Sequence, residues 1–479
     1  MPTIKERAAI KPSLPRKDPT LSYWQDPPDE IAGVRTSTNL PEDADYVIIG
    51  SGISGALIAF GLLEKKPNAK IVMLEARGAC SGASGRNGGH TKAGSYRAFP
   101  KLLERYGKEE ALKIVQLEYD NIVATHAFAA KYDIACESRA CDTVDIVYDK
   151  ATFDDGVEAV KLIQENLGTT AGIGRYAIYD ADAARREFLT PGEDVCGAIT
   201  YAAGSISAYR FGVGILKMCL KLGLNLQTFT PAEAISSSEG IWTAKTPRGE
   251  IMTPNLILAT NGYSAQLLPQ LQGKIVPIRG QVTAHRSGPK ISKLRPQGLD
   301  TTYSFIYRNG YEYMIPRPFL PSTPEHLSGD IVIGGGIGKL PNEGLSEYGE
   351  TDDTVLNSNN SAYLHQTTKT YFGENWGDDH PTERVRNDWT GIMGFTGDGH
   401  PLVGELPGKK GLWISAGFNG HGMVLCLKCA EALTHMLLDI GTEVFGTWFP
   451  SSFAITEERL EEMVFKGYIT TASEQTGGK

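Results

Sequence analysis

The stretch Tyr46–Gly55, YVIIGSGISG, together with Lys70–Glu75, KIVMLE, decides the fold of this chain. An apolar run, a glycine turn, an amphipathic run and a second apolar run predict a strand, a helix and a parallel strand in that order. This is the βαβ unit that seats a dinucleotide, because the glycine turn leads directly into the N-terminus of the helix.

Each residue of the turn has its own physical purpose. Gly50 allows the tight turn, Gly52 lets the backbone approach a pyrophosphate, and Gly55 lets the helix pack closely on the strand. The free N–H groups at the helix N-terminus favour phosphate. Glu75 ends the second strand, where a carboxylate accepts hydrogen bonds from ribose hydroxyls and repels a 2′-phosphate, which disfavours NADP. The candidate phosphate-binding residues are Gly50, Ser51, Gly52, Ile53, Ser54 and Gly55.

The size and charge of the chain exclude several classes of protein. With 479 residues the chain exceeds what one hydrophobic core usually supports, which predicts two domains. The net charge of −9 and the lack of a basic run argue against nucleic acid as a partner. No apolar run is long enough for a transmembrane helix, and the N-terminal residues lack the apolar core of a signal peptide. We therefore expect no membrane partner and a cytoplasmic protein.

The seven cysteines form an odd set without the spacing of a disulfide framework. Cys426 and Cys429 make a CxxC pattern, but it lies in an apolar helical run and has no second pair. We therefore expect reduced thiols in the core and no zinc or other metal site.

The rest of the chain alternates between helical and strand-like segments. Apolar spacing predicts helices over 98–140 and 150–187, and the prolines of 1–41 predict an extended arm on the surface without a core of its own. Residues 275–340 are rich in strands. The turn Asn309-Gly310 predicts a hairpin on which Tyr307, Tyr311 and Tyr313 share a face, either in the core or around a substrate.

This order predicts an α/β (α+β) protein of two domains. A Rossmann-like cofactor domain is assembled from discontinuous segments, and a substrate domain has a mostly antiparallel sheet with helices. The expected boundaries are 1–41 for the arm, 42–97, 195–274 and 386–445 for the cofactor domain, 98–194 and 275–385 for the substrate domain, and 446–479 for a C-terminal tail.

Two further motifs carry a family resemblance. They are Glu75-Ala76-Arg77 with GASGRNGGH at 82–90, and DWTG…FTGD…PLVG…GFNGHGM between Asp388 and Met423. With them the chain resembles the D-amino-acid-oxidase-like FAD-dependent oxidoreductases, which include glycine and sarcosine oxidases, and in particular a fungal and bacterial branch with GASGRNGGH. The resemblance covers roughly residues 22–445.

The resemblance implies FAD as cofactor and oxidation of a C–N bond in an amine or amino acid to an imine. Hydride would pass to flavin N5, and oxygen is the expected acceptor for reoxidation. The loop of 81–90 would run beside the pyrophosphate and the flavin ring, and the loop of 417–423 would lie at the pyrimidine end of the ring. The implied FAD-binding residues, beyond the turn and Glu75, are Ala76, Arg77, Ser81, Gly82, Ala83, Ser84, Arg86, Asn87, Gly88, Gly89, His90, Ala232, Ala259, Thr260, Asn261, Gly417, Phe418, Asn419, Gly420, His421, Gly422 and Met423.

Two positions depart from the family pattern. Sarcosine-type enzymes attach the flavin to a cysteine near the position of Met393, where this chain has none, so we expect non-covalent FAD. Those enzymes also hold the substrate carboxylate with a lysine where this chain has Val424.

Three residues are candidates for catalysis. His421, between two glycines, is expected to line the flavin or the substrate, with a structural turn as the alternative. Arg279 and Gln281 begin a strand that in the family reaches the flavin. Arg279 would pair with a substrate carboxylate or assist oxygen, with a surface salt bridge as the alternative. Two other functions stay open, a biosynthetic enzyme that uses the imine for cyclisation or desaturation and a non-catalytic flavin- or dinucleotide-binding sensor.

Overall fold

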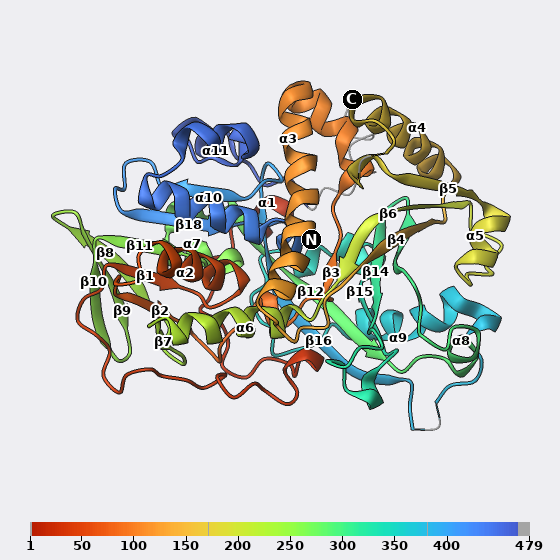
Figure 1. Ribbon diagram of the computed structural model, residues 1–479, viewed down its shortest axis with the longest axis horizontal. Coiled ribbons are helices and arrows are strands. Elements are labelled where there is room, and N and C mark those ends of the chain that lie inside the picture. Colours follow the sequence, from red (N-terminus) through yellow and green to blue (C-terminus); the bar gives the residue numbers. More distant parts are fainter. Residues whose placement is uncertain (1, 171, 381, 468–479) are drawn as a thin grey trace.

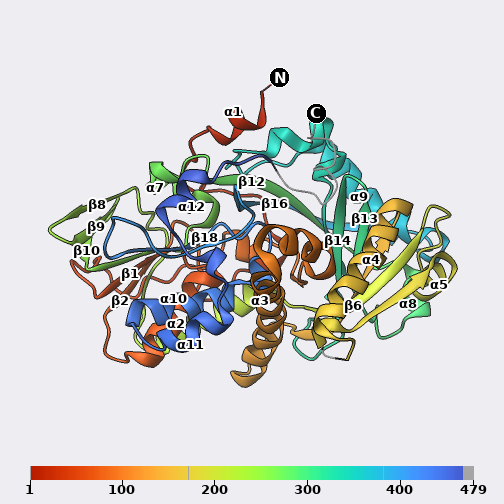
Figure 2. The same cartoon turned by 90° about the horizontal axis from the view of Figure 1, so that it is seen from above.

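The computed structural model of the protein describes residues 2–170, 172–380 and 382–467. Two large sheets stand side by side, and the long helix α3 (Ser95–Lys131) rises between them (Figure 1). The view from above shows the same division, with α2 and α10 over one sheet and α4 and α5 beside the other (Figure 2). The predicted α/β class with two domains is confirmed.

The first sheet has six strands and carries the predicted βαβ unit. β1 pairs in parallel with β2 on one side and with β11 on the other, while β17 is antiparallel to β18. In spatial order the strands are β17 (Leu402–Glu405), β18 (Leu412–Ala416), β11 (Asn255–Leu258), β1 (Tyr46–Ile49), β2 (Ile71–Leu74) and β7 (Asn225–Gln227).

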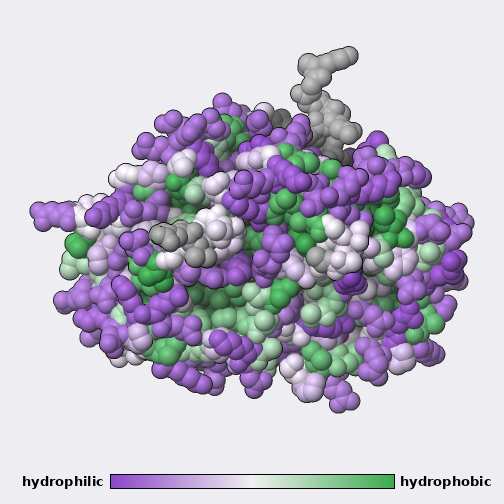
Figure 3. All heavy atoms as spheres, turned by 45° about the horizontal axis from the view of Figure 1, so that its top comes forward, coloured by the Kyte–Doolittle hydropathy of each residue, from purple (hydrophilic) through white to green (hydrophobic). Residues whose placement is uncertain are grey.

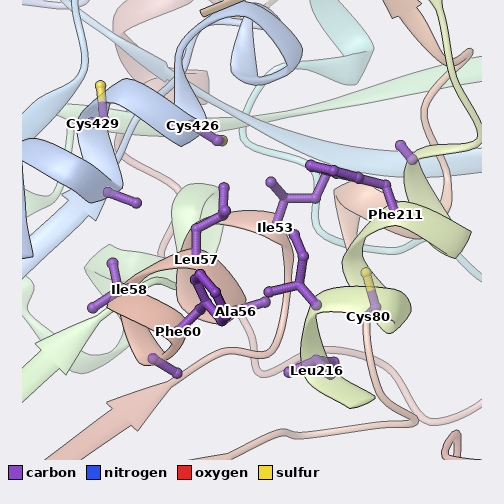
Figure 4. Close-up of a cluster of buried hydrophobic side chains, with 14 of the residues drawn as sticks. Ile53, Ala56, Leu57, Ile58, Phe60, Cys80, Phe211, Leu216, Cys426 and Cys429 are labelled. Atoms are coloured by element: carbon purple, nitrogen blue, oxygen red, sulfur yellow. The ribbon is translucent and has the colours of Figure 1, made fainter. Parts of the chain in front are cut away.

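Helices cover one face of this sheet and a small sheet covers the other. The helices are α2 (Ile53–Lys65), α6 (Ala208–Lys221) and α10 (Cys426–Leu438). Their apolar side chains form one continuous core, in which residues such as Ile53, Phe211 and Cys426 meet (Figure 4). The small sheet consists of β8 (Ala234–Ser238), β9 (Ile241–Thr246) and β10 (Gly249–Thr253).

The second sheet has nine strands and is mostly antiparallel. Its longest pairing joins β12 to β16 over their whole length, and among the described strand pairs of this sheet only β13 with β4 runs parallel. The strands in spatial order are β16 (Val385–Thr396), β12 (Ile275–His285), β15 (Ile331–Gly335), β14 (Gly310–Pro316), β13 (Thr302–Tyr307), β4 (Arg139–Val147), β6 (Gly197–Ser205) and β3 (His90–Thr91), with β5 (Tyr176–Asp180) on β6. The flanking helices are α4 (Lys150–Leu167), α5 (Ala181–Glu187), α8 (Pro289–Leu294) and α9 (Ser358–Phe372).

Several sequence-based boundaries differ from this arrangement. β6 and β16 belong to the nine-stranded sheet, although the expected boundaries put 195–274 and 386–445 in the cofactor domain. The expected helix of 150–187 is interrupted by β5, a strand whose pairing partner is β6. Both differences arise from pairing between distant segments, which local periodicity does not report.

The Asn-Gly hairpin forms as predicted, but its tyrosines do not share one face. Ile306 lies opposite Tyr311, so Tyr311 and Tyr313 face one side of the sheet and Tyr307 the other. The rings of Tyr311 and Tyr313 are 6.5 Å apart, whereas Tyr307 stacks on Tyr148 at 5.3 Å. The expectation that all three alternate onto one face is therefore wrong, because the two-residue turn shifts the parity between the strands.

The N-terminal arm is not the surface segment expected for 1–41. It contains α1 (Ile4–Ala8) and a 3-10 turn η1 (Tyr23–Gln25), and both Tyr23 and Trp24 are buried in the main core. Trp24 Nε1 donates to the carbonyl of Asn87 at 2.7 Å, and Ser22 Oγ donates to Gly85. The arm therefore supports the back of the glycine-rich loop.

Three elements follow α10 in the described part of the chain. They are α11 (Thr442–Trp448), a 3-10 turn η11 (Ser451–Phe453) and α12 (Glu457–Glu462). Of the predicted tail 446–479, residues 468–479 lie outside the described part of the chain. Within the described part, no helix has the length and apolar character needed to cross a membrane. Hydrophilic residues cover most of the face shown in Figure 3, with hydrophobic residues in groups between them.

The core of the first domain gives a matched test on one helix. Leu216 is 0% exposed on α6, whereas Leu222 at its C-terminal end is 44% exposed. We expect Leu216→Ala to lower the free energy of unfolding by about 2–5 kcal/mol, because it leaves a cavity in a packed core. Leu222→Ala should change it by less than about 0.5 kcal/mol. Chemical denaturation followed by circular dichroism measures both, and equal losses would contradict the packing described here.

Candidate active site

A cavity of about 1000 Å³ lies where the two sheets and α3 meet. Its lining comes from the glycine turn after β1, the loop of 82–94, the first turns of α3, strands β12 to β16 and the loop of 418–423. This volume lies at the upper end of the range for ligand sites, as a dinucleotide with a small substrate requires.

Most of the residues predicted to hold the cofactor converge on this cavity. Those that line it are Gly50, Ser51, Gly52, Ile53, Ser54, Glu75, Ala76, Arg77, Gly82, Ala83, Ser84, Arg86, Asn87, Gly88, Gly89, His90, Ala232, Ala259, Thr260, Asn261, Phe418, Asn419, Gly420, His421, Gly422 and Met423. Gly55, Ser81 and Gly417 are not among the lining residues. Four segments that are far apart in sequence thus meet at one place.

The glycine turn has the geometry that a dinucleotide needs. Gly50 adopts a φ of 110°, and a Cβ on Gly55 would lie 2.0 Å from the carbonyl oxygen of Gly50. Gly55 therefore serves the packing of α2 on the turn and is not among the residues that line the cavity. A Cβ on Gly82 would meet nothing within 4 Å, so the backbone there is open to a group in the cavity. The N-terminus of α2, capped by Gly52, faces the same space.

The carboxylate of Glu75 is held in place beside this turn. One oxygen accepts hydrogen bonds from Ser51 N at 3.0 Å and Ser51 Oγ at 2.6 Å, and the other accepts from Arg77 N at 2.9 Å. An ionised carboxylate offers about four acceptor sites, so this one can also accept from a ribose hydroxyl. The turn, the open Gly82 and Glu75 together fit the adenosine diphosphate half of FAD.

The loop after Glu75 is anchored by two buried arginines. Arg77 donates to Asp353 at 2.8 Å and to the carbonyl of Ser81 at 3.0 Å. Arg86 donates to the carbonyl of Thr390 at 2.5 Å and to Thr20, and burial lowers its pKa to about 10. The guanidinium of Arg86 thus binds protein groups behind the loop, which differs from the pyrophosphate contact that the sequence predicts.

A second hydrogen-bonded group of loops forms the opposite wall. Asn261 Oδ1 accepts from Gly417 N at 3.0 Å, and Asn419 Oδ1 accepts from Thr396 N at 2.8 Å. Asn419 N donates in turn to the carbonyl of Gly394. These bonds fix the loop that ends at His421 relative to β16 and the first sheet.

Two cations that line the same cavity act electrostatically on His421 and were not predicted. Burial lowers the pKa of His421 to about 4, and the charges of Lys92 and Arg97 add to this effect. Lys92 Nζ donates to Asp145 at 2.5 Å and to Ser304 Oγ at 2.6 Å. Arg97 lies over the ring of Tyr311 at 5.5 Å. Both basic residues follow the GGH motif closely in sequence, and that proximity was the signal that could have found them.

His90 is also at the cavity, but it is bound to the sheet behind. Its Nε2 pairs with Thr302 Oγ1 at 2.7 Å, and burial holds its pKa well below the ordinary value, with the charge of Lys92 acting in the same direction. Its ring is therefore neutral and fixed.

The structure does not bring Arg279 to the cavity. Its Nε pairs with Glu347 Oε2 at 2.7 Å and its Nη1 donates to the carbonyl of Asp352, while the adjacent Gly280 is the residue that lines the space. Gln281 does line it, but its amide nitrogen donates to Ser361 Oγ and Asp388 Oδ1. Since alternate residues of a strand face opposite sides, Gly280 on the cavity side places the side chain of Arg279 on the other, and Gln281 reaches the cavity although its amide nitrogen is bound to Ser361 and Asp388.

Comparison with known proteins agrees with this geometry. The model of the family described as DAO, FAD dependent oxidoreductase, matches residues 45–436. The gamma-glutamylputrescine oxidoreductase of Escherichia coli is 24% identical over 436 residues, 90% of this chain and 91% of that protein. A probable oxidoreductase OrdL of Haemophilus influenzae is 25% identical over 250 residues, 51% of this chain and 56% of that protein.

Among solved structures, glycine oxidase from Geobacillus kaustophilus has the same fold. It superposes with a TM-score of 0.67 at 18% identity, covering 87% of this chain and 99% of that one. Within the described residues no cluster of three or more acidic, histidine or cysteine side chains could hold a metal ion.

The position of Glu75 predicts the effect of its removal. Glu75→Ala should weaken FAD binding about ten- to hundredfold, because a hydrogen bond to a charged acceptor contributes about 1.5–3 kcal/mol. Glu64→Ala, which removes an exposed carboxylate from the far end of α2, is the control and should leave the affinity unchanged. Titration of the apoprotein with FAD, followed by flavin fluorescence, measures both. Equal affinity of Glu75→Ala and the parent protein would contradict the assignment of the ribose contact.

Proposed function

The chain belongs to the DAO family of FAD-dependent oxidoreductases, and we propose that it oxidises a C–N bond of an amine or amino acid to an imine. The main support is one juxtaposition: the dinucleotide seat and the group of His421, Lys92 and Arg97 share a single cavity. The names of two relatives, gamma-glutamylputrescine oxidoreductase and glycine oxidase, point to the same class of substrate.

Different residues would bind different parts of the cofactor. The N-terminus of α2 would bind the pyrophosphate, Glu75 the ribose, and the loop of 417–423 the pyrimidine end of the ring. When bound, FAD would supply the acceptor for a hydride from the substrate carbon, with oxygen as the expected oxidant of the reduced flavin. The substrate would lose this hydride from carbon and a proton from nitrogen to solvent, and water would then add to the imine carbon.

Non-covalent binding of FAD is supported by the state of the nearest thiol. Cys426 is the one cysteine among the lining residues that the structure describes, and burial raises its pKa to about 12. A thiol that stays protonated is a poor nucleophile towards the flavin. Met393, at the position where sarcosine-type enzymes carry the linking cysteine, also lines the cavity.

The residues near His421 favour the reactive form of the substrate. The positive charges of Lys92 and Arg97, which act with burial to lower the pKa of His421, would lower the pKa of a substrate amine in the same place. The amine is then bound in its neutral form, with a lone pair that assists departure of the hydride. Neutral His421 can exchange a hydrogen bond with the amine, while Arg97 and Lys92 take the role of anion anchor that the sequence assigned to Arg279.

An anaerobic screen tests the proposed reaction. The FAD-loaded protein should lose its yellow flavin absorbance on addition of at least one amine or amino acid without oxygen, and should regain it when oxygen is admitted. Bleaching without recovery would indicate a dehydrogenase that uses another acceptor. A flavin that no amine or amino acid reduces would contradict the proposal and favour a binding role.

His421 supplies the sharper test of the site. His421→Ala should slow flavin reduction about 10²–10³-fold while FAD content stays normal, because it removes a placed hydrogen-bonding group from the reacting centre. His326→Ala, at an exposed position distant in sequence and outside the cavity lining, should leave the rate unchanged. Stopped-flow absorbance with a substrate from the screen gives both rates. A rate within about threefold of the parent protein would return His421 to a purely structural role.

A further inference from the structure

A row of basic side chains runs along the first segment of α3. Arg97, Lys101 and Arg105 are spaced four residues apart, and all three line the cavity. The segment ends at Gly107, where a φ of 77° breaks the helix. Residues four apart share a helix face, and each step advances about 6 Å along the axis. We call this row the cationic stripe.

The stripe leads from the interior to the surface. Arg97 and Lys101 are half-buried and Arg105 is exposed. Arg105 Nη1 donates to the carbonyl of Asp398 at 2.9 Å, which ties the outer end of the stripe to the loop of 397–401. A guanidinium has five N–H donors, so Arg105 can bind a carboxylate in addition to this carbonyl.

Acidic groups near the inner end offset part of these charges. Asp145 is buried behind Lys92 and also accepts from Tyr96 and Tyr201. Burial raises the pKa of Glu118 to about 7, although backbone N–H groups of Gly94 and Ser95 oppose the shift, so at neutral pH this carboxyl is only partly ionised. Asp145 thus offsets the charge of Lys92, while the stripe places three basic side chains along the cavity of a protein whose net charge is −9.

We propose that the substrate is an amine with two carboxylates, one held by Arg97 and Lys92 beside the flavin seat and the other by Lys101 and Arg105 at the outer end of the stripe. Acidic amino acids and N-carboxyalkyl amino acids have this chemistry. The inference rests on the proposed function and narrows its substrate class. The spacing supports it, because one step along the stripe separates two cationic positions by about the reach of a short dicarboxylate.

Electrostatics make the stripe effective for such a ligand. A dianion is repelled by the protein as a whole, and a local row of cations offsets this repulsion at the one place where binding is productive. The outer contact is near solvent, so added salt should weaken it more than the buried contact at Arg97.

Binding of simple carboxylates tests the stripe without turnover. Glutarate is butyrate with a second carboxylate on its terminal carbon, and both can be titrated into the FAD-loaded protein by calorimetry. Glutarate should bind about tenfold more tightly than butyrate, and this advantage should shrink as sodium chloride is raised.

Variants of the stripe test whether it causes the tighter binding of glutarate than of butyrate. Lys101→Gln and Arg105→Gln should each remove most of the advantage of glutarate and leave the affinity for butyrate unchanged, whereas Arg105→Lys should retain it. Lys108→Gln is the matched control, because Lys108 is exposed on the same helix and does not line the cavity. Thermal unfolding and FAD content verify folding. If Lys101→Gln does not fold, the comparison of Arg105→Gln with Arg105→Lys, at an exposed position, tests the stripe instead.

The outcomes separate this inference from the proposed function. Reduction of the flavin by amines, with equal binding of glutarate and butyrate, overturns the two-carboxylate class alone. An unchanged glutarate affinity in Arg105→Gln overturns the role of the stripe. If no amine or amino acid of any charge reduces the flavin, the proposed function fails, whatever the carboxylates do. In the anaerobic assay, N-carboxymethylglycine should half-saturate at a lower concentration than N-methylglycine, with a similar limiting rate of reduction.

Discussion

The buried carboxylate of Asp353 holds together the parts on which the rest of the site depends. Arg77 donates to it at 2.8 Å, and the Nε of Arg86 lies 3.8 Å away. These two arginines bracket the glycine-rich loop, which has little other means of staying in one conformation, since glycine loses the most freedom on ordering. Removing one partner from such a buried group is costly, because the remaining charges stay desolvated. The loop can therefore present its backbone to a cofactor only while this group of charges is complete.

The same carboxylate couples the two sheets. Asp353 lies between β15 and β16 of the second sheet in sequence, while Arg77 follows the end of β2 in the first. The loop then continues into β3, a member of the second sheet, so one short segment belongs to both. The cavity lies along this segment, and its lining therefore includes residues of both sheets. No separate hinge is needed to bring the two sheets together around the cavity.

The parts predictable from sequence were those set by local geometry. The turn of Gly50 and Gly55, the carboxylate of Glu75 and the Asn309-Gly310 hairpin each depend on a few adjacent residues, and the structure has them as expected. The predictions that failed concern side chains whose partners are distant in sequence. Arg279 forms an ion pair with Glu347, and Arg86 donates hydrogen bonds to Thr390 and Thr20. No local sequence pattern indicates these partners. Lys92 and Arg97 were missed because a basic residue near a helix start is commonplace on a surface, and only the tertiary fold turns these two inwards.

The N-terminal arm has a consequence for how the protein is made. Its Thr20 hydrogen-bonds to Asp353, and Tyr23 Oη donates to Asp330 at 2.5 Å, partners more than 300 positions later in the chain. During synthesis the first residues to leave the ribosome must wait for these partners before they can dock. Closing contacts of such long range is slow, so the arm joins the structure after both sheets have begun to form. The back of the glycine-rich loop is thus completed by the first part of the chain to be made, and only after residues as far as Asp353 have left the ribosome.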